Sequence, residues 1–329
     1  MILVISDNDD YTTKLVLEWL DHFEKEFIRI NREDKIKIKS ITYGGKGDVC
    51  LQIHETEFYS SQISSIWHRR GLMMVNDFLH YSVEHHEINS IADGFKYALS
   101  AHSNARQEIL EFTAHRKPIF RIGRNMQGRI NKPNVLKVAE SLGLKIPKTI
   151  LTTKLKDVQL FMSKNKNGTI TKSIDINFLA QEKENQTMSL FSQYTEEVCS
   201  EDLVEFPDEF SLTKFQEKLD KVYEVRTFFW LGQCFSQAFF TQLNKKTSLD
   251  SRNYDKTKKT RTFPINLPLD IEQKIVLLMK ELDLETGSLD FVRTVDKGFV
   301  FLEVNPRGQF GYLSKSCNYE IEKIIAQAL

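Results

Sequence analysis

The chain has 329 residues, of which 41% are hydrophobic and 27% are charged. It is therefore long enough for a packed core, and longer than the chain that a single hydrophobic core usually organises. We therefore expect two or three subdomains. Lysine plus arginine and aspartate plus glutamate each number 45, which gives zero net charge. This balance argues against a protein that binds nucleic acid through bulk positive charge.

The sequence carries no sign of export or membrane insertion. The N-terminal segment MILVISDNDD lacks the basic start and the apolar core of a signal peptide. No apolar run approaches the roughly 20 residues that cross a bilayer, so we expect no membrane partner. The four cysteines are far apart and form no C-x-x-C pair, which argues against a zinc site or a disulfide framework. We predict a cytoplasmic protein.

The first third of the chain alternates strand-like and helix-like patterns. Residues 6–9 (SDND) are typical helix caps and precede apolar positions at helical spacing. We expect a helix around residues 15–23 and strands at residues 2–5, 27–30, 36–42 and 49–53, the last two forming a hairpin. These patterns predict an α/β segment.

Two features of this segment allow a functional alternative. The glycine cluster at 44–47 resembles a phosphate loop, but Lys46 is followed by Gly47 and not by a serine or threonine that opens a helix, which favours a plain turn. The charged end of SIWHRRG, with Arg69 and Arg70, fits either a solvated loop or an anion contact. Histidines in the helix-like stretch 84–112 lack metal-ligand spacing, which favours structural positions.

A second α/β block begins at residues 119–122. Pro133 suits the first turn of a helix, which Gly143 would close. We expect residues 144–152 to lead into a further strand, followed by a helix at 157–163 and a strand at 169–174. Residues 180–202 are polar and acidic and predict a mobile or partner-facing segment. The basic run KTKKTR at 256–261 is typical of a solvated loop.

The stretch from Ser288 to Asn305 predicts a hairpin with two carboxylates facing each other. The runs SLDFVRT and GFVFLEVNP flank VDKG, and a two-residue loop at 296–297 would pair Val295 with Gly298. In that register Asp290 faces Glu303 and Ser288 faces Asn305. Directly opposed like charges are destabilising unless a cation lies between them.

A divalent cation would relieve this repulsion. Glu303 and Asn305 are two apart on one strand and share a face with Asp290, so oxygen ligands suited to Mg²⁺ surround one point. The alternative is a pair of exposed acids on a solvated sheet face. Upstream, Glu224 and Arg226 also share a strand face, where an acid can bind ribose hydroxyls and an arginine can bind phosphate.

Taken in order, these features resemble the ATP-grasp ligase superfamily over about residues 119–314. They comprise Lys132 before a helix, Lys172 on a strand (TITKSI), the FQEKL link, EVRTF, SLDFV and FLEVNPRGQFG. Within it, the sequence is most similar to graspetide synthetases, the microviridin-type and grasp-with-spasm peptide maturases. SIWHRRG, NKPNVLKVAESLGLKIPKTILT, DSRNYD and EVNPRGQFGYL carry this finer likeness.

The resemblance implies a fold and a set of roles. The fold class is α/β (α+β), with an N-terminal pre-ATP-grasp domain at 1–118, a central subdomain at 119–214 and a C-terminal grasp subdomain at 215–329. The implied ligands are ATP phosphates for Lys132, Lys172 and Arg226, adenine for Gln216, Glu217, Lys218 and Leu219, ribose for Glu224, and Mg²⁺ for Asp290, Glu303 and Asn305. The central subdomain would also carry a leader-peptide segment around 180–202.

The implied reaction is ATP-dependent activation of Asp or Glu side chains in a ribosomal precursor peptide with a leader and a core. A Ser or Thr hydroxyl would then form an ester, or a Lys amine an amide. By charge and location, Arg307 is a candidate for stabilising the acyl phosphate, and Arg69 or Arg70 for holding the acceptor carboxylate. The likeness also suggests a homodimer.

Two alternatives stay open at this point. One is an ATP-grasp ligase that adds amino acids to a protein tail or joins small metabolites. The other is a catalytically inactive grasp domain that only binds peptide, against which the intact Asp290, Glu303 and Asn305 set argues. Nucleic-acid binding through the run at 256–261 is disfavoured by the zero net charge.

Overall fold

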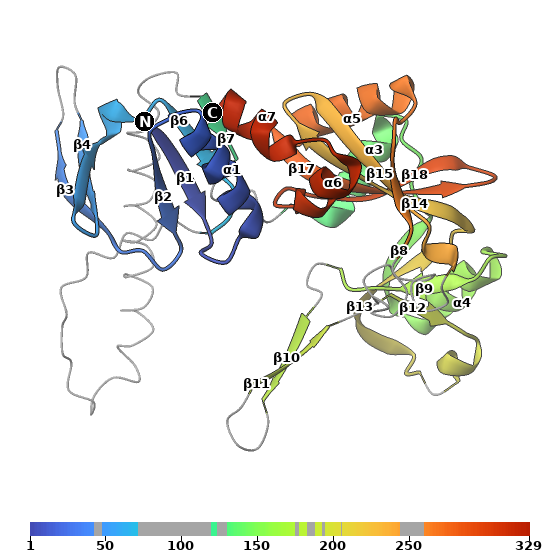
Figure 1. Ribbon diagram of the computed structural model, residues 1–329. Helices are drawn as coiled ribbons and strands as arrows, with labels where there is room; N and C mark the ends of the chain where they lie inside the picture. Colours follow the sequence, from blue (N-terminus) through green and yellow to red (C-terminus); the bar gives the residue numbers. More distant parts are fainter. Residues whose placement is uncertain are drawn as a thin grey trace, which may run out of the picture. The chain divides into compact units, whose positions relative to one another are not determined.

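The computed structural model divides into two compact units, Met1–Gly128 with Glu320–Leu329, and Arg129–Tyr319 (Figure 1). It describes residues 1–42, 48–71, 120–123, 130–174, 178–182, 188–192, 195–204, 206–243 and 260–329. The glycine cluster at 44–47, the stretch 84–112, DSRNYD and most of the run at 256–261 lie outside the described residues. Within the described ranges, no helix has the length and apolar character needed to span a bilayer.

The first unit is built on a parallel sheet with the strand order β2-β1-β6-β7. Its strands are β1 (Ile2–Ser6), β2 (Phe27–Asn31), β6 (Ser65–His68) and β7 (Phe120–Ile122). Strand β1 is buried along its whole length, as expected for a central parallel strand. Helix α1 (Tyr11–His22) begins after Asp10, whose side chain accepts a hydrogen bond from the Thr12 backbone. The cap therefore lies one residue beyond the predicted 6–9.

A small antiparallel sheet completes this unit and confirms the predicted hairpin at 36–53. Its strands β3 (Ile36–Ile41), β4 (Val49–Ile53) and β5 (Thr56–Tyr59) are followed by the short 3₁₀ helix η1 (Ser60–Gln62). The two sheets share one apolar core, in which residues of β1 and β2 pack with residues of β3 and β4. Apolar alternation therefore placed these strands correctly.

The last helix, α7 (Ile321–Ala328), belongs to the first unit. It contacts α1, and Lys25 Nζ donates hydrogen bonds of 2.9 Å to the carbonyl oxygens of Ala326 and Gln327. The last turn of a helix has carbonyls without intrahelical partners, which explains why a lysine stabilises it. The sequence-based division placed these residues with the C-terminal subdomain, whereas tertiary packing groups them with the N-terminal unit.

The second unit contains a central sheet with the strand order β12-β9-β13-β8. Its strands are β8 (Thr149–Lys154), β9 (Thr169–Thr171), β12 (Glu196–Val198) and β13 (Glu209–Glu217). Helix α4 (Leu155–Ser163) covers one face through a core that includes Val158 and Phe215. The predicted mobile stretch 180–202 overlaps the hairpin of β10 (Phe178–Glu182) and β11 (Met188–Ser192) and the 3₁₀ helix η2 (Glu201–Leu203).

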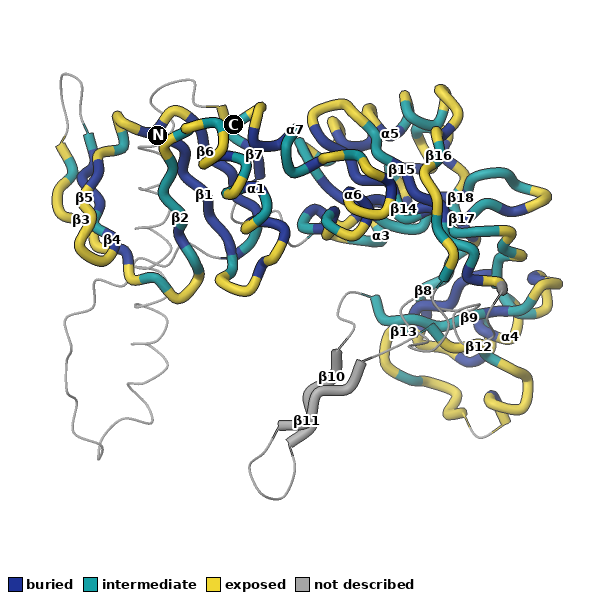
Figure 2. The backbone as a smooth tube through the Cα atoms, viewed as in Figure 1, coloured by how far each residue is buried: buried dark blue, intermediate teal, exposed yellow. Residues whose placement is uncertain are grey.

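A five-stranded sheet with the order β16-β15-β14-β17-β18 forms the rest of this unit. Its strands are β14 (Lys221–Trp230), β15 (Gln233–Phe239), β16 (Thr262–Ile265), β17 (Thr286–Thr294) and β18 (Gly298–Asn305). The 3₁₀ helix η3 (Thr241–Leu243) follows β15. Helices α3 (Lys132–Ser141) and α5 (Leu269–Glu281) pack on one face in the main apolar core. Figure 2 shows β14 and β17 largely buried between exposed loops.

Helix α6 (Gly311–Cys317) lies against the opposite face of this sheet, where it contacts β15 and β16. The Phe310 ring before it lies 4.9 Å from the Phe228 ring, and Tyr312 stacks on Phe239. The rest of that face, toward β17 and β18, carries the polar residues of the candidate site. The fold therefore leaves one half of a sheet face for binding.

The β17–β18 hairpin differs from the prediction in its turn. Thr294, and not Val295, pairs with Gly298, so the loop has the three residues 295–297. The predicted pairing of Val295 with Gly298 is wrong because the loop is one residue longer. Gly298 has φ +77°, a conformation that glycine adopts without steric penalty.

A β-bulge then brings the predicted carboxylates opposite each other. Phe291 pairs with Phe301, but Asp290 pairs with Glu303, so Leu302 is an additional residue on β18. The bulge compensates for the longer loop, and the pairs Asp290–Glu303 and Ser288–Asn305 are confirmed.

Candidate active site

The acidic residues predicted from the sequence line up across three strands. Arg226 on β14 pairs with Asp290 on β17, which in turn pairs with Glu303 on β18. Glu224 lies two residues before Arg226 and shares its face. Because paired residues on neighbouring strands point to the same side of a sheet, Arg226, Asp290 and Glu303 form one row across the sheet, and Glu224 lies beside this row on the same face.

Arg226 and Asp290 form a two-pronged ion pair. The Arg226 Nε and Nη2 atoms donate to the two Asp290 carboxylate oxygens at 2.8 and 3.0 Å. The charge of Asp290 raises the pKa of Arg226 above its ordinary value, with smaller contributions from Glu303 and Glu224, while desolvation opposes the shift. A cation bound by Asp290 must therefore compete with Arg226, so the predicted metal and phosphate roles of these two residues are coupled.

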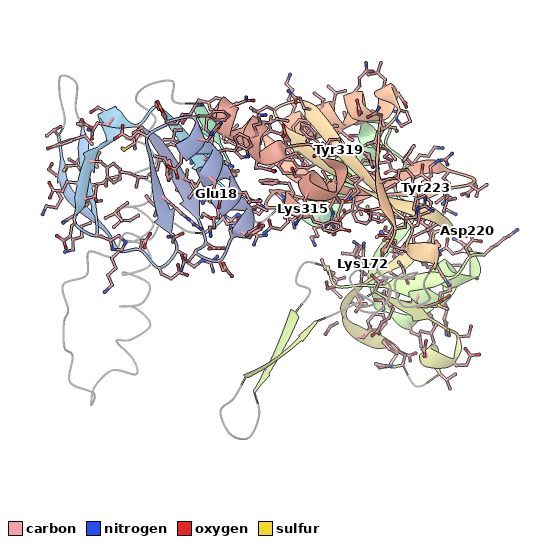
Figure 3. The ribbon with its side chains drawn as sticks, in the orientation of Figure 1. Glu18, Lys172, Asp220, Tyr223, Lys315 and Tyr319 are labelled. Carbon is pink, nitrogen blue, oxygen red and sulfur yellow. The ribbon has the colours of Figure 1, made fainter. Side chains whose placement is uncertain are left out.

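Lysines surround Glu303 from the central sheet and from α3. Lys132, the first residue of α3, places Nζ 3.4 Å from Glu303 Oε2. Burial opposes ionisation of Glu303, but the positive charges of Lys172, Lys132 and Lys214 outweigh it and lower the pKa of this carboxyl. Figure 3 shows Lys172 between the central sheet and the five-stranded sheet of the same unit; it lies one residue beyond β9 and not in the strand.

Lys214 is the member of this group that sequence reasoning missed. Only 4% of its surface is exposed, and its neighbour Phe215 packs in the core beneath α4, so Lys214 points to the opposite face. Burial, together with repulsion from Lys172 and Lys132, lowers the pKa of Lys214 to about 8, although Glu303 opposes the shift. Alternation in LTKFQE could have indicated the face, but nothing local indicated the charges that it meets.

The predicted adenine-contact residues are held firmly by the protein. Residues 215–217 belong to β13 and not to a polar link, and only 218–220 connect β13 to β14. Glu217 accepts hydrogen bonds from the Lys148 backbone at 2.9 Å and from Lys297 Nζ at 2.6 Å. Lys297 lies in the β17–β18 turn, so this ion pair fastens that turn to the end of β13.

Neighbouring side chains in this segment also have protein partners. Gln216 donates to Thr149 Oγ1 at 2.8 Å, and Lys218 pairs with Glu197 at 2.6 Å. The role of Gln216, Glu217, Lys218 and Leu219 as adenine contacts stays a prediction.

The remaining predicted residues of this unit lie at the edges of the row. Glu224 accepts hydrogen bonds from Lys221 Nζ at 2.8 Å and from Thr241 Oγ1 at 3.0 Å. Asn305, at the exposed end of β18, accepts a hydrogen bond from the Arg307 backbone at 3.0 Å. Their ribose, metal and acyl-phosphate roles stay predictions.

Arg69 and Arg70 belong to the first unit and follow β6. The Arg69 side chain is 4% exposed and lies 3.4 Å from Asp10, a fully buried carboxylate, and Arg70 lies 3.7 Å from the same group. Arg69 therefore has a structural partner, and Arg70, whose side chain is 32% exposed, is the more accessible of the two. Their role toward an acceptor carboxylate stays a prediction.

The donor set fits magnesium held mainly by a ligand's phosphates. In the described ranges, no group of three His, Cys, Asp or Glu side chains is arranged to hold a metal. Asp290 and Glu303 face each other, and Asn305 ends the same strand face. Magnesium commonly takes one or two carboxylates and completes its octahedron with phosphate oxygens and water, so this set is sufficient.

A cavity of about 460 Å³ lies beside the site, between α3 and β8. Pro133, Leu136, Ile146 and Leu151 give it an apolar lining, and Lys137, Glu140 and Lys148 are also part of its wall. None of the residues predicted to bind nucleotide or metal lines it.

Comparison with solved structures identifies the fold. The macrocyclase MdnC from Microcystis aeruginosa MRC, bound to the precursor peptide MdnA, has a TM-score of 0.72 and 23% identity, over 100% of this chain and 99% of MdnC. The Chryseobacterium gregarium RiPP-associated ATP-grasp ligase, in complex with ADP and a leader and core peptide, has a TM-score of 0.74 and 23% identity, over 99% and 94%. This chain has the ATP-grasp fold.

A third ATP-grasp ligase, PsnB complexed with minimal precursor, Mg and ADP, has a TM-score of 0.67 and 16% identity, over 99% of this chain and 95% of PsnB. No protein-family model and no curated protein matches the amino-acid sequence. The likeness is therefore one of ATP-grasp structure, and it confirms the fold class predicted from the sequence. It covers both units of the chain.

Proposed function

We propose that this protein is an ATP-dependent ligase that activates Asp or Glu side chains of a ribosomally made precursor peptide and joins them to Ser or Thr hydroxyls, or to a Lys amine. The observation that carries the proposal is the pairing of Asp290 with Glu303 beside a cluster of lysines, within an ATP-grasp fold. The likeness to ligases solved with ADP and with leader and core peptides supports the substrate class.

The charges of the site are separated in a way that suits magnesium-bound nucleotide. Lys214 lies on β13 of the central sheet and Lys172 directly follows β9 of that sheet, whereas Asp290 and Glu303 lie on the five-stranded sheet. Phosphates attract the lysines, and a divalent cation attracts the carboxylates. A nucleoside triphosphate with bound magnesium supplies negative charge for the lysines and positive charge for the carboxylates. A simple anion or a simple cation supplies only one of the two.

The chemistry needs activation because hydroxide is a poor leaving group from a carboxylate. A peptide carboxylate attacks the γ-phosphorus of ATP, which forms an acyl phosphate and releases ADP. A hydroxyl or amine then attacks the acyl carbon, phosphate leaves, and the proton of the nucleophile passes to solvent or phosphate. The net change in the peptide is the loss of one water for each link.

The residues of this chain act on charge and position during these steps. Lys132 and Lys172 bind phosphate oxygens, and Arg226, once released from Asp290, binds the transferring group. Magnesium, when bound, draws charge from the phosphoryl oxygens. Preorganised cations of this kind supply most of the stabilisation in phosphoryl transfer, because the transition state spreads negative charge over its oxygens. Arg307 would then hold the acyl phosphate.

We further infer a cytoplasmic setting and a homodimer. The four cysteines are free, which fits a reducing compartment.

Arg70 is the better candidate in the first unit for contacting an acidic core peptide, since Arg69 is buried with Asp10.

Intact mass of a candidate precursor peptide, incubated with the protein, ATP and Mg²⁺, tests the proposal. We expect successive losses of water from the peptide with wild type and none with Asp290→Asn, which removes the charge that binds Arg226 and the cation. Asp296→Asn is a matched control, because Asp296 is an exposed acid in the turn of the same hairpin. It should process the peptide as wild type does.

The alternatives give different masses. Addition of amino-acid residues would raise the peptide mass and would identify a tailing ligase in place of a cyclase. An unchanged peptide with steady ADP release would refute the peptide substrate while keeping the nucleotide site. Wild type that neither releases ADP nor changes the peptide would refute ligase activity.

A further inference from the structure

Gln237 continues the row of site residues onto the next strand of the five-stranded sheet. It lies on β15 and pairs with Arg226 on β14, so its side chain points to the same face as the row. Helix α6 contacts β15 (Figure 1), and Gln237 has an exposed fraction of 0%. A buried amide needs hydrogen-bond partners for both its nitrogen and its oxygen.

The contacts with α6 fix the orientation of this amide. Gln237 Nε2 donates a hydrogen bond to Ser316 Oγ, and the Ser316 hydroxyl donates to the Tyr312 carbonyl oxygen at 2.7 Å. A serine hydroxyl has a single proton, so toward Gln237 it can only accept. Burial raises the pKa of the Cys317 thiol, and a hydrogen bond with the Gln237 side chain is among the smaller effects that oppose the shift. A hydrogen bond with this effect is donated to the sulfur, so the nitrogen side of the amide faces α6.

The amide oxygen of Gln237 lacks a partner. Among the residues that the structure describes, no donor forms a hydrogen bond with the buried Oε1 atom. Its direct cross-strand neighbours are Pro264 on β16 and Arg226 on β14. Proline has neither an N–H nor a polar side chain, whereas Arg226 has N–H groups in addition to those that donate to Asp290. Because a buried acceptor without a donor destabilises the folded chain, its place beside an arginine indicates a role that involves that arginine.

We propose that Gln237 is a positioning residue for Arg226, whose guanidinium donates to Gln237 Oε1 when it leaves Asp290 to bind phosphate. The inference rests on the proposed function, because Arg226 binds the transferring phosphoryl group there. Release from Asp290 removes both carboxylate oxygens as acceptors, and Gln237 Oε1 replaces one of them on the same sheet face. The amide is neutral, so it orients the guanidinium without cancelling the positive charge that attracts phosphate.

A double-mutant cycle on ligand affinity tests this inference. Calorimetric titration of the full chain with Mg-ATP, and separately with inorganic tripolyphosphate, gives the dissociation constants. Gln237→Met has a similar length but no acceptor, and it should weaken both ligands by about 10-fold, the lower end for one hydrogen bond to a charged group. In an Arg226→Met background the same change should weaken them by less than about 2-fold, because no guanidinium is left to orient.

Gln233→Met is the matched control. Gln233 is an exposed glutamine at the start of the same strand, and it pairs with Trp230, which lies outside the row. This variant should bind both ligands as wild type does. Thermal unfolding of each variant shows whether a loss of affinity reflects a loss of fold. If Gln237→Met does not fold, Ser316→Ala takes its place in the cycle, because it releases the amide from α6 at an exposed position and should weaken both ligands only where Arg226 is present.

The outcomes separate this inference from the proposed function. Wild-type affinity in Gln237→Met, or in Ser316→Ala where that variant replaces it, would overturn the role of Gln237 and leave the ligase proposal intact. Equal losses with and without Arg226 would also overturn it, since Gln237 would then act through the fold alone. A loss that depends on Arg226, with no change in peptide mass by wild type, would support the positioning role and overturn the proposed reaction. Wild type that binds neither ligand would overturn both.

Discussion

Replacing Lys214 by methionine should stabilise the folded protein against unfolding. Burial and two neighbouring lysines lower the pKa of Lys214 from 10.5 to about 8. The charged form is therefore disfavoured in the folded state by about 3 kcal/mol, since one pKa unit corresponds to about 1.4 kcal/mol. Methionine has a similar length and no charge, so Lys214→Met should gain up to that amount at pH 7.

The sign of the pH dependence follows from proton uptake. Between pH 8 and pH 10.5 the unfolded chain still holds the Lys214 proton that the folded chain has lost. The free energy of unfolding of wild type therefore rises with pH between pH 8 and pH 10.5. Below pH 8 the folded state bears the full cost of the charged Lys214 side chain. The advantage of Lys214→Met over wild type should shrink across the same window and vanish near pH 10.5.

Denaturant unfolding of both proteins without nucleotide, at pH 7, 9 and 10.5, measures this difference. Lys214→Arg serves as the control, because arginine stays charged throughout and should show no gain. A methionine variant no more stable than wild type at pH 7 would refute the reasoning. So would a gain that is the same at all three pH values, since improved packing and not removal of a charge would then explain it.

Three further predictions concern the contacts that shape the site. Glu217→Gln should lower the free energy of unfolding by about 1–3 kcal/mol in denaturant titrations, because it removes the partly buried ion pair with Lys297; Asp270→Asn, at a surface pair, should change it by less than about 1 kcal/mol. Gly308→Ala should reduce stability and ATP turnover together, because the new Cβ would lie 2.2 Å from the Ser288 side chain; equal melting temperatures would contradict the close approach. Removing residues 320–329 should destabilise the first unit by roughly 4 kcal/mol or more, because two isoleucines and an alanine of α7 are buried in the folded protein. Limited proteolysis should then cleave the N-terminal unit faster than in the full chain.

Much of the fold and part of the site followed from local patterns in the sequence. Period-two alternation placed Glu224 with Arg226, and Asp290 with Glu303, on common strand faces, as the register confirms. The hairpin turn was predicted incorrectly, because a longer loop and a bulge at Leu302 compensate for each other. The spacing of Phe301 and Val304, both buried in the same core, is a signal of that bulge.

The sequence by itself determined which side chains share a strand face, because alternation along a strand is a property of neighbouring residues. The tertiary structure alone decided which charges meet. In the folded chain, Lys132 and Lys214 from distant segments lie near Glu303, and Arg226 forms an ion pair with Asp290. The last helix packs with the first unit. These contacts depend on which strands and helices become neighbours, and that choice is made by long-range packing, which leaves no mark on the local sequence around any one of them.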